Sequence, residues 1–145
     1  MTLPNEMLDR QAPPGIRFLR AWLLPLGSAA GKRESGDMLP FTLIQRYAGA
    51  ENEHTDYGYY QLDHLAKAMD GKPAFTACED YARNCMRRLL YLRDHPWTEV
   101  EVPGWGVATA DRVLCLESPH YDPYGDTTIE RFISRYEIHL RLVRP

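Results

Sequence analysis

The residues that could take part in catalysis or metal binding are not clustered in this sequence. Its histidines are scattered, and none is spaced from another histidine, a cysteine or a carboxylate as zinc ligands on one element are. They are His54, His64, His95, His120 and His139. His120 and Asp122 come nearest to a metal-binding or hydrolytic pair, but no third ligand accompanies them. A small hydrolase that uses these two residues is the alternative from the enzyme class.

Other signatures of catalysis are missing as well. No serine lies in a Gly-x-Ser-x-Gly turn, and no phosphate-binding or dinucleotide-binding glycine pattern occurs. The three cysteines lack paired spacing, which is typical of free thiols in a reducing compartment. Cys78 and Cys85 lie two helical turns apart on an apolar face, so we expect them to be buried. The sequence thus predicts no catalytic residue, no metal and no cofactor, and a protein that is not an enzyme.

The composition limits the class of protein further. The chain has 145 residues, of which 44% are hydrophobic and 26% charged, as in one globular domain. No apolar run approaches roughly 18 residues, and the start of the sequence lacks a basic stretch followed by an apolar one. We therefore expect neither a membrane span nor a secretory signal. A net charge of −3 argues against a general affinity for nucleic acid.

Hydrophobic periodicity predicts the elements that must position any site. Helical spacing of apolar residues predicts a first helix over 15–26, which Pro25 ends, and a long helix over 74–93. Leu89 lies on the apolar face of the long helix and is expected in the core. Alternating patterns predict four strands, with a further short alternating stretch at 97–102 before a turn at 103–106. The four strands cover 41–47, 57–65, 107–117 and 131–142.

The order of these elements indicates the fold class. Residues 1–14 are expected to form a flexible N-terminal arm, and residues 15–145 a single α+β domain. The order α-β-β-α-β-β predicts a two-layer α+β sandwich, in which two helices pack on a mostly antiparallel sheet of four or five strands. The connections are expected to be a flexible segment over 27–37, an acidic loop over 48–56 and a loop over 118–128.

Charge gathers locally although the chain as a whole is acidic. The outer face of the long predicted helix and the polar face of the last predicted strand are basic, and the loop at 48–56 is acidic. These could be solvated faces with pairs such as Glu79 to Arg83. The functional interpretation is contact between subunits, with the acidic loop of one copy against the arginine face of another. The residues assigned to this subunit interface are Glu51, Glu53, Asp56, Arg83, Arg87 and Arg88.

Several short motifs resemble those of one protein family. The run Leu39-Pro40-Phe41-Thr42-Leu43-Ile44-Gln45-Arg46, followed by the acidic loop that reaches Asp56, resembles the first strand and loop of tail terminator proteins. These proteins belong to long-tailed bacteriophages (siphoviruses), and the likeness is to those that infect actinobacteria. The similarity covers roughly 39–142. It continues at Gly104-Trp105-Gly106-Val107-Ala108 with Asp111, at Glu117-Ser118-Pro119 with Tyr124 and Asp126, and at Arg131 and Arg135-Tyr136-Glu137-Ile138.

The resemblance implies a structural protein of the virion. Members of this family form a homo-oligomeric ring, a hexamer, on the last ring of the tail tube protein, where they end tube polymerisation. Their opposite surface meets the head-completion (neck) connector protein at the head-tail junction, and DNA passes through the ring. For this chain the resemblance implies assembly in the host cytoplasm, no cofactor and no membrane. It also implies a channel or interface role for Arg131, Arg135 and Arg141. The alternative is another neck protein, a head-closure or tail-completion connector.

Overall fold

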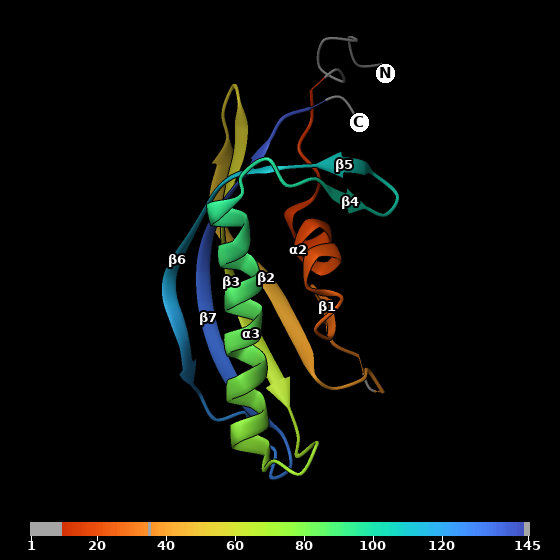
Figure 1. Cartoon of the computed structure of the whole chain (residues 1–145), viewed down its shortest axis with the longest axis vertical. Coiled ribbons are helices and arrows are strands. Elements are labelled where there is room, and N and C mark those ends of the chain that lie inside the picture. The colour runs from red at the N-terminus through yellow and green to blue at the C-terminus, as the bar shows by residue number, and fades with distance from the viewer. Residues whose placement is uncertain (1–9, 35, 144–145) are drawn as a thin grey trace.

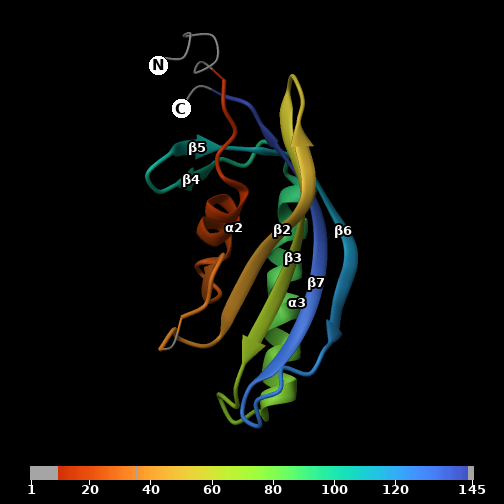
Figure 2. The ribbon, with the colours of Figure 1, turned by 180° about the vertical axis from the view of Figure 1, so that it is seen from behind.

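The computed structural model describes residues 10–34 and 36–143. Two helices pack on one face of a mostly antiparallel, five-stranded mixed sheet, and a small two-stranded hairpin lies beside them (Figure 1). Figure 2 shows the molecule from behind, where neither described helix covers the other face of the sheet. The α+β class predicted from the sequence is confirmed.

The sheet joins segments that are far apart in the sequence. Its order is β1-β2-β3-β7-β6, so that the last strand, β7, lies inside the sheet between β3 and β6. The pair β1–β2 is parallel, and the other three pairs are antiparallel. The strands are β1 (Ser28–Ala30), β2 (Phe41–Glu51), β3 (Thr55–Ala66), β6 (Ala110–Tyr121) and β7 (Glu130–Arg141).

The long helix α3 (Ala74–Asp94) closely matches its predicted range and covers the half of the sheet formed by β3, β7 and β6. It begins after Pro73, whose fixed φ suits a helix start, and its apolar residues face β3, β6 and β7. Leu89 is 0% exposed, which confirms its predicted place in the core. The shorter helix α2 (Gly15–Leu23) packs beside it through buried residues that include Phe18, Leu19 and Leu23.

Two buried tyrosines fill the space between the layers. Tyr60 of β3 and Tyr136 of β7 are register partners, and both are almost completely buried. A Cβ atom at Gly15 would lie 1.7 Å from the hydroxyl of Tyr60. Glycine at the first residue of α2 therefore lets the helix approach the sheet closely.

The prediction of an acidic loop over 48–56 is wrong, because most of these residues lie in the two strands of a long hairpin. β2 continues to Glu51 and β3 begins at Thr55. A bulge between Arg46 and Ala48 shifts the alternation of side chains by one residue, which is why the pattern seems to end there. Gly49 has a φ of +123°, and a Cβ atom there would lie 2.1 Å from the carbonyl oxygen of Tyr57. The hairpin thus depends on glycine at this position.

Other connections also contain regular structure that the sequence did not predict. The segment predicted to be flexible over 27–37 contains β1, which pairs with the start of β2. Helix α2 ends at Leu23 rather than at 26, two residues before the proline. β6 extends to Tyr121, beyond three irregularities in its pairing with β7. The strands β4 (Val100–Val102) and β5 (Gly106–Ala108) form the small hairpin around the predicted turn.

The predicted N-terminal arm lies only partly within the described residues. Residues 1–9 are outside them. Gln11 forms two backbone hydrogen bonds with Val143, of 2.8 and 2.9 Å, so this part of the arm is paired with the segment that follows β7.

Leu89→Ala tests the packing of α3 on the sheet. The substitution leaves a cavity in the core, and we expect it to lower the free energy of unfolding by about 2–5 kcal/mol. Urea denaturation measures the change. Leu24→Ala is the matched control, because Leu24 is 63% exposed and should change stability by no more than about 0.5 kcal/mol. Equal losses in the two variants would contradict the packing described here.

Candidate interaction surfaces

The acidic residues predicted for a subunit interface divide into two kinds. Glu51 ends β2 and Glu53 lies in the hairpin turn, where both side chains are exposed. Asp56 lies in β3 and accepts two hydrogen bonds from the Arg46 guanidinium, at 2.7 and 3.0 Å. This pairing raises the pKa of Arg46. The tip of the hairpin therefore carries two carboxylates that have no ion pair within the described residues, whereas Asp56 is neutralised by Arg46.

The hairpin tip is held in a fixed shape. The side-chain oxygen of Asn52 accepts hydrogen bonds from the backbone N–H groups of His54 and Thr55, both at 2.8 Å. Such bonds close a turn locally. Figures 1 and 2 show the hairpin projecting past the C-terminal end of α3, so that its tip stands clear of the core. We define the acidic tip as Glu51 and Glu53.

The arginines predicted on the long helix also differ in whether their side chains have partners. Arg83 and Arg87 are exposed on the side of α3 that faces away from the sheet, and within the described chain neither guanidinium has an ion pair or a hydrogen bond. Arg88 instead lies 3.9 Å from the centre of the Trp22 ring and donates to the Trp22 carbonyl. The Trp22 indole donates in return to the Arg88 carbonyl at 2.8 Å. Arg88 thus ties α2 to α3, and we define the arginine crest as Arg83 and Arg87.

The arginines predicted for a channel or an interface all lie on the open face of the sheet, and each is paired within the chain. Arg131 is 2.8 Å from Asp122 and also donates to backbone carbonyls of the loop after β6. Arg135 is 3.4 Å from Glu117, and Arg141 is 3.1 Å from Asp111. These pairs leave the open face close to electrically neutral.

Aromatic side chains accompany these charges on the open face. Tyr47 lies 6.2 Å from Tyr59, and Tyr57 lies 5.8 Å from His139, measured between ring centres. His139 forms a 2.6 Å contact with Glu137, and this bond lowers the pKa of that carboxyl group. Tyrosine, arginine and histidine on a partly exposed, neutral surface are typical of protein interfaces. The alternation of polar and apolar residues in the last predicted strand indicates this face from the sequence.

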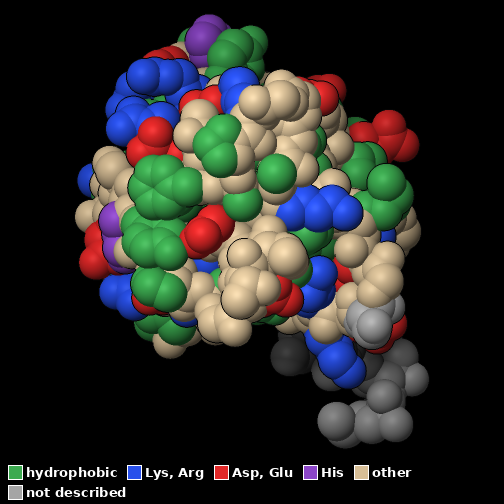
Figure 3. Space-filling view, turned by 90° about the horizontal axis from the view of Figure 1, so that it is seen from below, with side chains coloured by type: hydrophobic (Ala, Val, Ile, Leu, Met, Phe, Trp, Pro, Cys, Tyr) green, Lys and Arg blue, Asp and Glu red, His purple; other side chains and the backbone are tan. Residues whose placement is uncertain are grey.

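A second aromatic group lies at the end of the molecule where α3 begins. Phe75 and Tyr121 are 45% and 42% exposed, and their ring centres are 5.1 Å apart. Both rings pack on the buried Phe132. Figure 3, which views the molecule from this end, shows hydrophobic side chains on the surface among charged ones. This end thus differs in character from the end that carries the acidic tip.

His120 and Asp122, which are assigned to the alternative hydrolase, do not form a pair within the described residues. Asp122 binds Arg131, and no hydrogen bond or ion pair joins it to His120 within the described residues. His120 is exposed on β6, and its Nδ1 lies 3.3 Å from the Ser118 carbonyl oxygen. In residues 10–34 and 36–143, no group of three or more histidine, cysteine, aspartate or glutamate side chains is placed to hold a metal ion.

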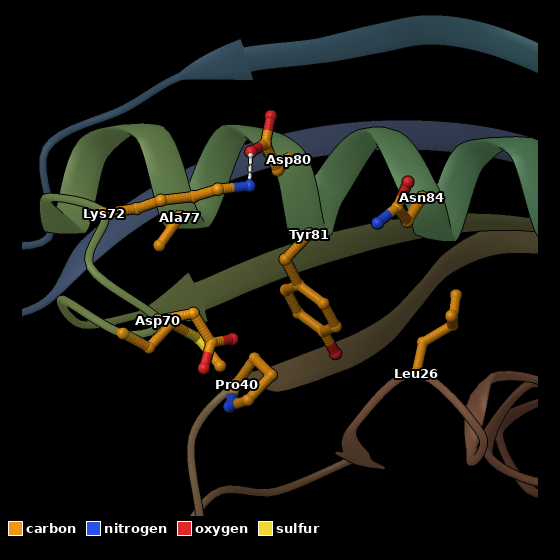
Figure 4. Close-up of a pocket in the computed structure, with 9 residues that line it drawn as sticks. Leu26, Pro40, Asp70, Lys72, Ala77, Asp80, Tyr81 and Asn84 are labelled. Atoms are coloured by element: carbon orange, nitrogen blue, oxygen red, sulfur yellow. Dashed lines mark hydrogen bonds and ion pairs between the residues drawn. The ribbon is translucent and has the colours of Figure 1, made fainter.

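A small hollow opens between α3, the start of β2 and the turn after β3 (Figure 4). Its volume is about 180 Å³, below the roughly 300 Å³ typical of small-molecule sites. Lys72 and Asp80 form a 2.7 Å ion pair at its rim. The Tyr81 side chain points across the hollow toward β2, as Figure 4 shows, and its hydroxyl is 2.7 Å from the hydroxyl of Thr42.

Beneath this hollow lies a buried polar network that sequence analysis missed. Thr42 links Tyr81 to Nδ1 of His64 at 3.0 Å, and Nε2 of His64 lies 2.9 Å from the hydroxyl of Ser134. Thr42, His64 and Ser134 are 0% exposed. A serine beside a histidine is a pairing used for nucleophilic catalysis, but no substrate can reach a hydroxyl that is fully buried. The network therefore orients the core, and burial lowers the pKa of His64 to about 3.

The cysteines are free thiols, as predicted. Cys78 and Cys85 are fully buried, and Cys115 is half-buried. Cys78 donates to the backbone carbonyls of His64 and Glu130, at 3.1 and 3.3 Å. Burial raises the pKa of Cys78 to about 11 and that of Cys85 to about 12, so both stay protonated at neutral pH.

No protein-family model matches this sequence, and no curated protein matches it closely enough to count as a relative. Neither described helix is long and apolar enough to cross a membrane.

His64 makes stability depend on pH. Its pKa is about 3 in the folded chain and about 6.5 when solvated, so the unfolded chain binds one more proton between these values. The contribution of His64 to stability is fully present above pH 6.5. Below that, the free energy of unfolding falls by about 1.4 kcal/mol per pH unit as the pH drops toward 3. Urea denaturation from pH 8 to pH 4 measures this slope.

His64→Gln should reduce that slope, because glutamine can hydrogen bond but takes up no proton in this range. His120→Gln on the exposed part of β6 is the matched control for the substitution itself. Identical pH profiles for wild type and His64→Gln would show that His64 is not the group responsible.

Proposed function

We propose that this chain is a structural virion protein, the tail terminator of a long-tailed bacteriophage. In this role, copies of the chain form a ring that caps the tail tube, ends its polymerisation and joins the tail to the head-completion connector of the neck. The sequence resemblance over 39–142 supports the proposal, and so does the α+β fold with its long hairpin.

The observation that carries the proposal is the pair of unmatched charged surfaces. The acidic tip and the arginine crest have opposite charges, and neither finds a partner within the described residues. The tip stands beyond the end of α3, whereas Arg83 and Arg87 lie along the middle of that helix, so the two surfaces do not meet in one copy (Figure 1). A head-to-tail contact brings two different surfaces of neighbouring copies together, and repetition of such a contact closes a ring.

The two ends of the molecule suit two different axial neighbours. One end carries the projecting hairpin, and the other carries the exposed aromatic pair of Phe75 and Tyr121. A ring between a tail tube and a neck connector needs two unlike faces of this kind. The open face of the sheet, with its paired arginines and tyrosines, is then free to line the channel through which DNA passes or to meet a neighbouring copy.

Charge reversal tests the head-to-tail contact. Arg83→Glu together with Arg87→Glu places like charges opposite the acidic tip, so we expect the ring to dissociate. Adding Glu51→Arg and Glu53→Arg to the same chain reverses both partners, and we expect it to restore the ring. Size-exclusion chromatography with light scattering and negative-stain electron microscopy report the assembly.

Arg93→Glu is the control for this experiment, since Arg93 is an exposed arginine of the same helix that pairs with its neighbour Asp94 at 3.0 Å. Rings that form equally well from the Arg83→Glu/Arg87→Glu chain would rule out this contact.

Loss of the protein tests the function itself. Without a terminator, tube subunits continue to add, so cells infected with phage that lack this chain should accumulate overlong tails without heads. Electron microscopy of lysates measures tail length. Tails of normal length that fail to join heads would instead identify the chain as another neck connector. Normal, complete virions would contradict both assignments.

A further inference from the structure

An apolar hollow lies beside α2, apart from the surfaces described above. It has a volume of about 310 Å³ and is bounded by α2 and by the turn between β4 and β5. Ala21 lines it from the helix, Leu24, which is 63% exposed, lines it from just past the helix end, and Pro103 lines it from the turn. An exposed leucine in a concave, mainly apolar site is typical of a surface that another chain covers.

Two arginines flank this hollow. Arg17 and Arg20 stand one helical turn apart on the exposed side of α2, and both line the hollow. Within the described residues no ion pair or hydrogen bond engages either guanidinium. The site therefore suits a peptide segment that offers apolar side chains for the hollow and carboxylates for the two arginines.

The chain contains one segment with this chemistry outside its described residues. Residues 1–9 read MTLPNEMLD, with four large apolar side chains and two carboxylates, those of Glu6 and Asp9. We propose that this N-terminal segment of one copy docks in the hollow of a second copy, with its apolar side chains against Leu24 and its carboxylates on Arg17 and Arg20. The proposal rests on the proposed function, because the ring supplies the second copy.

The position of the chain at Gln11 favours a neighbouring copy over the same one. The backbone bonds between Gln11 and Val143 hold the chain beside the end of β7. From there the chain passes the β4–β5 hairpin before it reaches α2 (Figures 1 and 2). The described chain therefore begins beyond that hairpin, as seen from α2. Nine extended residues span about 30 Å, which is enough to extend past the surface of their own copy.

A peptide titration tests the proposal on the full chain. A synthetic peptide of residues 1–9 is titrated into trace amounts of labelled chain, dilute enough to keep copies apart. Three chains are compared: wild type, Glu6→Arg/Asp9→Arg, and Arg17→Glu/Arg20→Glu. We expect equal affinity for the first two chains and at least about a tenfold loss for the third, because only the third changes the receiving site. Salt should weaken the binding, since exposed charges form it.

The other outcomes overturn the proposal. No saturable binding to the wild type or the Glu6→Arg/Asp9→Arg chain would show that the hollow does not take this segment. Binding that is at least about tenfold weaker to wild type than to Glu6→Arg/Asp9→Arg would show that each copy fills its own hollow, since a tethered segment competes at a high effective concentration. Undiminished binding to Arg17→Glu/Arg20→Glu would place the peptide elsewhere. Unchanged thermal unfolding of the variants controls for folding.

This experiment is independent of the tail-length experiment. Overlong tails together with an inert peptide would leave the tail terminator assignment standing and remove the docking site. A peptide that binds as expected, together with normal virions in the absence of the chain, would remove the assignment and leave the site.

Discussion

The one-sided packing of α3 on β3, β6 and β7 is the constraint from which the other features follow. The face under the helix must exclude water, so it holds apolar side chains, two buried tyrosines and a polar network in which His64 has a partner on each ring nitrogen. The opposite face stays partly solvated and can keep its tyrosines, arginines and acids. Antiparallel sheets commonly divide their faces in this way, and the division separates stability from recognition.

The distribution of ion pairs extends this separation. On the open face, Arg131, Arg135 and Arg141 each have an acidic partner, which fixes their positions and cancels much of their charge. On the acidic tip, the arginine crest and the exposed side of α2, the charged side chains have no partners within the described chain. Charges of the second kind determine which surfaces of separate molecules approach one another, because their attraction is not already satisfied.

Sequence patterning predicted the helices and most of the sheet, because their periods are local. The apolar spacing from Cys78 to Leu92 is unbroken, so the long helix was placed almost to the residue. β2 was cut short because the bulge after Arg46 changes which face later residues occupy. β1 was missed because three residues are too few to show a period, and its pairing with β2 depends on the tertiary fold.

The candidate surfaces were predictable only in part for a related reason. The exposure of Arg83 and Arg87 follows from their position on the helix. Arg88 is not available to a partner because it binds Trp22, which is 66 residues away in the sequence. Asp56 is likewise bound by Arg46, which is 10 residues away. Periodicity cannot report either contact. The same is true of His64, whose partners come from β2 and β7. The hollow beside α2 needs the β4–β5 turn, which joins it only in three dimensions.

The backbone bonds between Gln11 and Val143 place the two ends of the described chain side by side. Segments that precede residue 10 or follow residue 143 consequently leave the described fold at the same corner of the molecule, next to the β4–β5 hairpin (Figure 1). A bulky neighbour at that corner would therefore obstruct both points at which the chain enters and leaves the fold.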